Sequence, residues 1–277
     1  MLLPGVIWLA LLFLVPLCVV IAVAFATTDI INRPVFGWHP SNFRLVVDPL
    51  YLRLLVRSVA FAALTTLICL VVGYPVAYTI ARFGGRYRNA LIGIVVLPWL
   101  IDYLVRIYAW VVILGNEGIV NSLLRHLGIT GTPPLQLTNT PIAVIVGLVY
   151  AYFPLMVLPL YATLEQLDLS LIEAGKDLFG TPRSTFWHVT LPFSTPGIVA
   201  GSLLVFLPCV GDFATARLLG GTSTYMIGNL ISDQFQQSGN WPFGAAITVV
   251  VMALMWLVIL AYLIYAWRQG RKGLEVV

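Results

Sequence analysis

Charged residues are scarce in this chain. Of its 277 residues, 9% are charged and 60% are hydrophobic, and the mean hydropathy is +0.96. A soluble domain of this length needs many more charged side chains to cover its surface. The composition therefore excludes an ordinary soluble globular protein, and no basic run is dense enough to suggest nucleic-acid binding.

Cysteine and histidine are equally sparse. The three cysteines show no CxxC spacing, which excludes a disulfide framework and a cysteine metal site; they are Cys18, Cys69 and Cys209. The three histidines lie between apolar segments without HExxH spacing, which argues against a zinc-dependent membrane protease; they are His39, His126 and His188. The chain also lacks a GxxxxGK[ST] phosphate loop, so it has no means of its own to bind ATP in that way. We expect no catalytic residue, no metal and no cofactor in this chain.

Long hydrophobic runs fill most of the sequence. Each holds roughly 20 residues, enough for a helix rising 1.5 Å per residue to cross about 30 Å of hydrocarbon. The polar boundaries predict an all-α polytopic membrane protein that forms a single transmembrane domain, residues 1–277. Its six spans are expected at residues 4–26, 54–81, 90–114, 141–164, 197–219 and 243–267.

Basic residues in the short loops predict the orientation. They are densest in the loops after the second and fourth spans and after the last span, at Arg82, Arg86, Arg88, Lys176, Arg183, Arg268, Arg271 and Lys272. By the positive-inside rule these regions face the cytoplasm. Both termini are then cytoplasmic, and so is the loop at residues 165–196.

Residues 171–196 are polar although the spans on both sides are apolar. The segment favours a helical turn, then a turn at Gly180-Thr181-Pro182 with Thr181 as N-cap and Pro182 as the first helical residue. A second helix is expected at residues 184–190, ended by Leu191-Pro192. The small Ala174 and Gly175 would let a partner surface approach the backbone closely. From physics alone, an ordinary cytoplasmic helical hairpin explains the segment as well as a docking element does.

The same stretch resembles the EAA loop of ABC-importer permeases. Glu173 and Ala174 match its Glu-Ala-Ala, and Leu191-Pro192 follows Glu173 by 18 and 19 residues, as the family pattern requires. Gly175 replaces the second Ala, and Phe179 stands where the family has Gly. The resemblance implies a coupling element that fits a groove on an ATPase subunit; its residues here would be Glu173, Ala174, Gly175, Asp177 and Gly180.

The similarity extends over most of the chain. The stretches LVRIYAW (104–110), GLVYAYFPLMVLPLY (147–161), LLGG (218–221), IGNLISDQF (227–235) and WPFGAA (241–246) are similar to those of spermidine/putrescine importer permeases, and to the first of the two permeases in such systems. The resemblance implies the fold of an ABC type I importer permease in the bacterial inner membrane, surrounded by lipid. It also implies a heterodimer with a second permease, an ATPase dimer at the cytoplasmic face that binds ATP and Mg²⁺, and a periplasmic substrate-binding protein. ABC permeases for another solute, such as ferric ion, phosphonate or thiamine, are the alternative.

A polyamine path needs carboxylates and aromatic faces, because the cargo carries several ammonium groups. Ionisable residues within spans are costly and point to functional sites. We therefore expect pathway residues at Asp102, Asp212, Tyr103, Tyr108, Trp110 and Phe213. Arg106, four residues after Asp102, offers a competing explanation, because a local ion pair on one helix face would make Asp102 structural.

Two intramembrane aspartates also raise a remote alternative, an aspartyl protease that uses Asp102 and Asp212. Such a dyad needs two carboxylates that share a proton. The sequence reads Cys209-Val210-Gly211-Asp212 where that family has Gly-x-Gly-Asp, and Asp102-Tyr103 where it has Tyr-Asp. Both motifs therefore argue against a protease.

Overall fold

The computed structural model describes residues 3–29, 33–128 and 134–274. The chain forms two compact units, residues 1–55 with 227–277 and residues 56–226. Helix α3 (Pro49–Phe83) runs across the boundary between them. The expectation of one permease domain for the whole chain stays a prediction.

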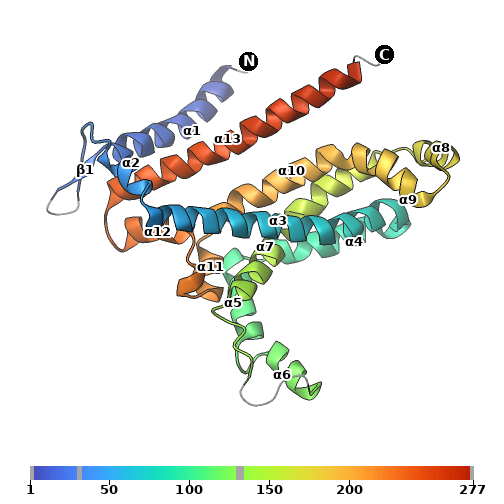
Figure 1. Ribbon diagram of the computed structural model, residues 1–277, viewed down its shortest axis with the longest axis horizontal. Coiled ribbons are helices and arrows are strands. Elements are labelled where there is room, and N and C mark those ends of the chain that lie inside the picture. The colour runs from blue at the N-terminus through green and yellow to red at the C-terminus, as the bar shows by residue number, and fades with distance from the viewer. Residues whose placement is uncertain (1–2, 30–32, 129–133, 275–277) are drawn as a thin grey trace. The chain divides into compact units, whose positions relative to one another are not determined.

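The first unit is built on two helices that pack side by side, α1 (Leu3–Ala24) and α13 (Trp241–Leu274) (Figure 1). A short antiparallel pair follows α1, in which β1 (Thr27–Thr28) pairs with β2 (Pro34–Val35). Two short helices, α2 (Ser41–Val46) and α12 (Ile227–Gln236), pack on α13. The Asn42 amide donates to the carbonyls of Ala24 and Ala26, which satisfies groups freed at the end of α1.

The second unit holds the remaining elements. After α3 come η1 (Gly85–Tyr87), α4 (Arg88–Val96), η2 (Leu97–Leu100), α5 (Tyr103–Leu114) and α6 (Ile119–His126). The chain then forms α7 (Pro141–Glu165), α8 (Leu169–Phe179), α9 (Pro182–Thr185), the π-helical turn η3 (Phe186–Thr190), α10 (Leu191–Val210), α11 (Ala214–Leu219) and η4 (Thr222–Thr224).

Helices α7 and α10 form the centre of this unit (Figure 1). Gly197 and Gly201, four residues apart on α10, face α7. A methyl group at Gly201 would lie 2.8 Å from the sulfur of Met156, and one at Gly197 would lie 2.8 Å from the carbonyl oxygen of Pro159. Small residues at this spacing let membrane helices approach closely and gain van der Waals contact. The buried core beside them comes from α3, α7 and α10: Cys69, Ala77, Met156, Val157, Leu160, Leu164 and Val205.

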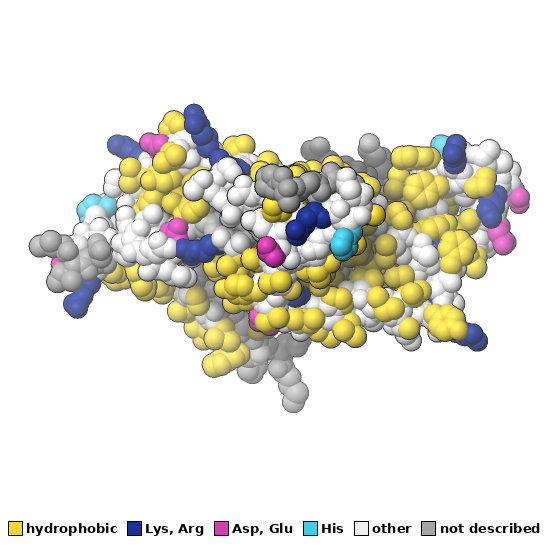
Figure 2. All heavy atoms as spheres, turned by 90° about the horizontal axis from the view of Figure 1, so that it is seen from below, with side chains coloured by type: hydrophobic (Ala, Val, Ile, Leu, Met, Phe, Trp, Pro, Cys, Tyr) yellow, Lys and Arg dark blue, Asp and Glu magenta, His cyan; other side chains and the backbone are white. Residues whose placement is uncertain are grey.

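The prediction of six membrane-spanning helices is confirmed. Among the described residues, six helices are long and apolar enough to cross a bilayer: Gly5–Ala24, Pro49–Phe83, Tyr103–His126, Pro141–Glu165, Pro182–Val210 and Trp241–Tyr262. Hydrophobic side chains cover much of the face drawn in Figure 2, as expected of a surface that meets lipid or other membrane subunits.

Two predicted spans contain a helix break in the structure. The expected span at 90–114 is broken into α4, η2 and α5, because Pro98 lies in a tight turn and Asp102 caps a new helix. The expected span at 197–219 begins earlier and stops at Val210; Asp212 then precedes the separate helix α11. Both aspartates therefore lie at helix breaks rather than inside continuous helices.

Candidate functional site

Asp212 is the centre of a buried polar cluster. Its side chain is 6% exposed, and its carboxylate accepts hydrogen bonds from residues on α5, α7 and α11. The Tyr103 hydroxyl donates to it, the Tyr152 hydroxyl donates at 2.9 Å, and Thr215 donates through its backbone N–H at 2.9 Å and its hydroxyl at 3.2 Å. A buried carboxylate is tolerated only when it is well hydrogen-bonded, and here four donors fill its acceptor sites. The cluster therefore joins three helices.

Asp102 has a different environment. It is exposed, and as N-cap of α5 its Oδ1 accepts the backbone N–H groups of Leu104 at 3.0 Å and Val105 at 3.3 Å. This cap satisfies two of the free donors at the start of the helix. The carboxylate stays accessible, so Asp102 is the aspartate that is open to a ligand in this structure.

Arg106 does not pair with Asp102. In the part of the chain that the structure describes, no ion pair joins the two, although Arg106 N–H donates to the Asp102 carbonyl at 3.2 Å. Arg106 is 7% exposed, and its Cζ lies 5.6 Å from the centre of the Tyr103 ring. Local charge neutralisation of Asp102, the competing explanation from the sequence, is therefore absent from the structure.

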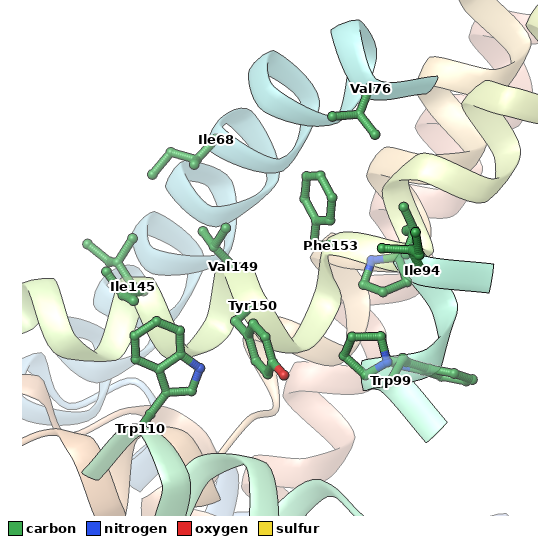
Figure 3. Close-up of a pocket in the computed structure, with 13 residues that line it drawn as sticks. Ile68, Val76, Ile94, Trp99, Trp110, Ile145, Val149, Tyr150 and Phe153 are labelled. Carbon is green, nitrogen blue, oxygen red and sulfur yellow. The ribbon is translucent and has the colours of Figure 1, made fainter. Parts of the chain in front are cut away.

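The other predicted aromatic residues divide between the surface and a cavity. Tyr108 and Phe213 are exposed. Trp110 meets Tyr150 edge to face, with ring centroids 5.5 Å apart, and both line a cavity of about 610 Å³ (Figure 3). The cavity lies between α3, α4, η2, α5 and α7, and none of its lining residues is charged. Trp110 thus faces apolar groups, and neither Asp102 nor Asp212 lines this cavity.

The sequence did not single out Tyr152 and Thr215. Thr215 follows Asp212 by three residues, a spacing at which a carboxylate accepts the N–H group of a following helix, so this signal was available. Tyr152 is 60 residues away in the chain and meets Asp212 only through the packing of α7. No local pattern points to it.

The predicted coupling hairpin consists of α8, α9 and η3. Asp168 caps α8 by accepting the Ser170 N–H at 2.9 Å, and this hydrogen bond lowers the pKa of the Asp168 carboxyl. Glu173, Ala174 and Asp177 are exposed on α8. Two large apolar side chains are also exposed on this polar element, Leu178 at 78% and Trp187 at 64%. Apolar side chains presented among charged ones are typical of a surface that meets a partner.

The structure contradicts the expectation that Gly175 lets a partner surface approach. It is buried, and a methyl group on it would lie 2.9 Å from Cγ2 of both Thr185 and Val189. The missing side chain therefore lets α9 and η3 pack on α8, rather than letting a partner approach. Ala174 keeps the exposed position that was expected of it.

The predicted turn is confirmed. Gly180 has φ of +70°, a left-handed conformation that glycine adopts without strain, and its N–H donates to the Lys176 carbonyl at 2.8 Å. Thr181 caps α9 by accepting the Ser184 N–H at 3.2 Å, and Pro182 is the first helical residue.

The expected end at Leu191-Pro192 is wrong, because the helix continues from η3 into α10. Pro192 lies in the first turn of α10, directly after a π-helical turn in which the hydrogen-bond pattern shifts, so its missing N–H interrupts little.

The two aspartates do not form a protease dyad. Asp102 is exposed at an N-cap, and the carboxylate of Asp212 is occupied by tyrosine and threonine donors. Within the described residues no hydrogen bond joins the two carboxylates, so they share no proton here.

Comparison with known proteins identifies the family. Residues 70–272 match the model of the binding-protein-dependent transport system inner membrane component. The chain is 42% identical to the spermidine/putrescine transport system permease protein PotB of Haemophilus influenzae over 92% of this chain and 89% of that protein. It is 38% identical to PotB of Escherichia coli over 95% and 94% of the two chains. Among solved structures, a bacterial ABC transporter involved in the import of the acidic polysaccharide alginate has the same fold, with a TM-score of 0.75, 20% identity, and coverage of 97% and 94%. The chain belongs to the family of binding-protein-dependent transport system inner membrane components, and is accordingly a multi-pass permease subunit of the inner membrane rather than an enzyme.

Proposed function

We propose that this chain is a permease subunit of an ATP-driven importer for spermidine and putrescine and forms half of its translocation pathway. The similarity to spermidine/putrescine permeases, which extends over nine-tenths of the chain, carries this proposal. The chemistry of the site agrees with a cationic cargo, because the accessible charged group at the break before α5 is the carboxylate of Asp102.

Asp102 is the residue that meets the cargo first in this proposal. Its Oδ1 caps α5, and its Oδ2 has no hydrogen-bond partner among the described residues. A carboxylate with one free oxygen at a helix break can accept an ammonium group without breaking the cap. Asp212, enclosed by Tyr103 and Tyr152, takes part only when those hydroxyls move away. The exposed rings of Tyr108 and Phe213 add aromatic faces on which an ammonium group can lie.

The hairpin of α8, α9 and η3 couples this pathway to ATP hydrolysis in a separate ATPase dimer. Leu178 and Trp187 supply apolar contacts, and Glu173 and Asp177 supply charge. ATP and Mg²⁺ bind to that ATPase, and this chain carries no cofactor. A second permease completes the membrane part, and a periplasmic binding protein delivers the cargo.

The substrate is tested by reconstitution. The chain is co-expressed with its second permease, ATPase and binding protein, and uptake of radiolabelled spermidine into proteoliposomes is measured with and without ATP. We expect ATP-dependent uptake, and about a tenfold higher KM for Asp102→Asn, because asparagine keeps the helix cap but loses the charge. If a ferric-ion, phosphonate or thiamine binding protein supports uptake of its own solute and polyamines are not taken up, the substrate proposal is wrong.

The coupling role is tested by charge reversal. Glu173→Lys should abolish uptake while the subunit still inserts into the membrane, because the exposed charge at the ATPase contact is inverted. Glu117→Lys is the matched control, since Glu117 is exposed in the loop between α5 and α6. Equal uptake by the two variants would remove the coupling assignment.

A further inference from the structure

Arg106 is a buried arginine with unused hydrogen-bonding capacity. Its side chain is 7% exposed, and its Nε is buried without a hydrogen-bond partner in the part of the chain that the structure describes. Its described side-chain contact is with an aromatic ring, that of Tyr103. An intramembrane cation is costly, and one that forms no ion pair with the described residues is expected to have a function.

This cation is connected to both pathway aspartates through neighbouring residues. Asp102 is the N-cap one turn before it, and the Arg106 backbone N–H donates to the Asp102 carbonyl at 3.2 Å. The ring of Tyr103 lies under the guanidinium, and the hydroxyl of that ring donates to Asp212. The guanidinium therefore contacts the tyrosine that binds Asp212, and it belongs to the residue that follows Asp102 by one turn.

We propose that Arg106 is a resident cation that limits the affinity of the pathway for its cargo. This inference rests on the proposed function, in which a polyamine ammonium group approaches Asp102 and Asp212. Arg106 adds a positive charge near this path and repels the incoming ammonium groups. A transport site must hold its cargo strongly enough to admit it and weakly enough to release it. Without a nearby cation, the two carboxylates would hold a polycation more tightly and release it more slowly.

Removal of the charge should therefore change binding and turnover in opposite senses. In the reconstituted transporter, Arg106→Gln should lower the KM for spermidine about tenfold, because the repulsion is lost. It should also lower kcat, because release becomes slower. Arg106→Lys keeps the charge and should leave KM close to that of the unmodified protein. A purely structural role would lower kcat without lowering KM, and lysine would not restore it.

A second arginine of the membrane part serves as control. Arg57 on α3 donates to the Tyr225 carbonyl at 3.3 Å, so Arg57→Gln also removes a charge from a span. It should not lower KM. Folding of each variant is checked by size-exclusion chromatography of the assembled transporter and by its basal ATPase rate.

The outcomes separate this inference from the proposed function. A lower KM in Arg106→Gln that Arg106→Lys does not show supports the resident cation. If Asp102→Asn raises KM for spermidine but Arg106→Gln leaves it unchanged or raises it, the pathway stands and the role of Arg106 is refuted. If the unmodified transporter takes up no polyamine, or Asp102→Asn and Asp212→Asn both leave KM unchanged, the proposed pathway itself fails, and the inference fails with it.

Discussion

The ring of Phe179 stacks on the imidazole of His188, with centroids 4.6 Å apart and planes 17° apart. Phe179 is the last residue of α8, and His188 lies in η3, where its Nδ1 is 2.8 Å from the Ser184 carbonyl oxygen. The two rings therefore tie the end of one hairpin helix to the next element. The position at which related loops have glycine holds an aromatic residue here, and Gly180 makes the turn one residue later.

Loss of this stack should loosen the hairpin. Phe179→Gly removes an aromatic contact of about 1 kcal/mol and lowers the helix propensity at the last position of α8, which costs about 0.5 kcal/mol more. We expect faster amide hydrogen exchange over residues 169–190 and a severalfold lower transport rate at unchanged KM for spermidine. Phe179→Leu keeps the helix propensity but not the ring. Its exchange and transport rates should lie between those of the unmodified chain and of Phe179→Gly. Exchange as slow in Phe179→Gly as in the unmodified chain would show that the stack is not what orders the hairpin.

The substitution Gly175→Ala has two opposing effects on the stability of the hairpin, and the neighbouring side chains decide which is larger. Alanine favours a helix over glycine by about 1 kcal/mol, but its methyl group would lie 2.9 Å from Cγ2 of Thr185 and Val189. Both neighbours are β-branched and stiff, so the overpacking should dominate and Gly175→Ala should destabilise the hairpin by about 1 to 2 kcal/mol.

The same substitution should become stabilising where the two methyl groups are absent. In a chain that carries Thr185→Ser and Val189→Ala, Gly175→Ala has room and should contribute its helix propensity, about 1 kcal/mol. Amide hydrogen exchange of α8 in both backgrounds measures the effect. A destabilisation of equal size in both would mean that the contact with Thr185 and Val189 is not its cause.

Local signals in the sequence predicted much of this molecule. The apolar runs predicted six spans, because a membrane helix must bury every backbone polar group and cover its length with apolar side chains. The turn was also readable, since Gly180 is the residue that adopts positive φ and Thr181 caps the helix that Pro182 begins. Each of these features is set by residues within a few positions of one another.

The rest depends on residues that meet only after folding. Tyr152 joins Asp212 across 60 positions, and the stack on His188 explains Phe179 only once η3 has packed back on α8. The breaks at Asp102 and Asp212 were missed for a related reason. An aspartate in an apolar run was interpreted as a charge within a membrane span. An aspartate can also accept backbone N–H groups at the start of a helix, and both residues do so here.

The orientation predicted from the basic loops leads to a labelling experiment. Cysteine is introduced singly at Asp177, on α8, and at Glu117, in the loop between α5 and α6, in a chain whose native cysteines are replaced. Both positions are exposed. In right-side-out vesicles, a membrane-impermeant maleimide should label position 117 and should label position 177 only after lysis. The reverse pattern would invert the topology and remove the hairpin from the cytoplasm.

The N-cap of α8 should make the hairpin sensitive to acid. Accepting the N–H of Ser170 lowers the pKa of Asp168 below its ordinary value in the folded chain. A carboxyl with a lowered folded pKa stabilises the fold above its unfolded pKa, about 3.9, and this stabilisation is lost as the pH falls through the folded pKa. Asp168→Ala should therefore speed exchange in α8 at pH 7, and the difference from the unmodified chain should shrink below about pH 4. A difference that does not change with pH would show that the charge is not what stabilises this helix end.

Tyr152 gives the clearest test of the cluster around Asp212. Tyr152→Phe removes a hydroxyl that donates to a buried carboxylate at 2.9 Å, and hydrogen bonds to charged groups contribute about 1.5 to 3 kcal/mol. The assembled transporter should therefore unfold at a lower temperature. Tyr103→Phe should have a comparable effect, because its hydroxyl donates to the same carboxylate. Tyr108→Phe is the matched control, since Tyr108 is an exposed tyrosine of α5 whose hydroxyl has no partner among the described residues.

Tyr103 and Tyr152 share one acceptor, so their effects on stability should be coupled. The loss of stability in the double variant should differ from the sum of the two single losses, whereas the losses in pairs with Tyr108→Phe should be additive. Additivity throughout would mean that Asp212 does not join α5 to α7, and that the two tyrosines act separately.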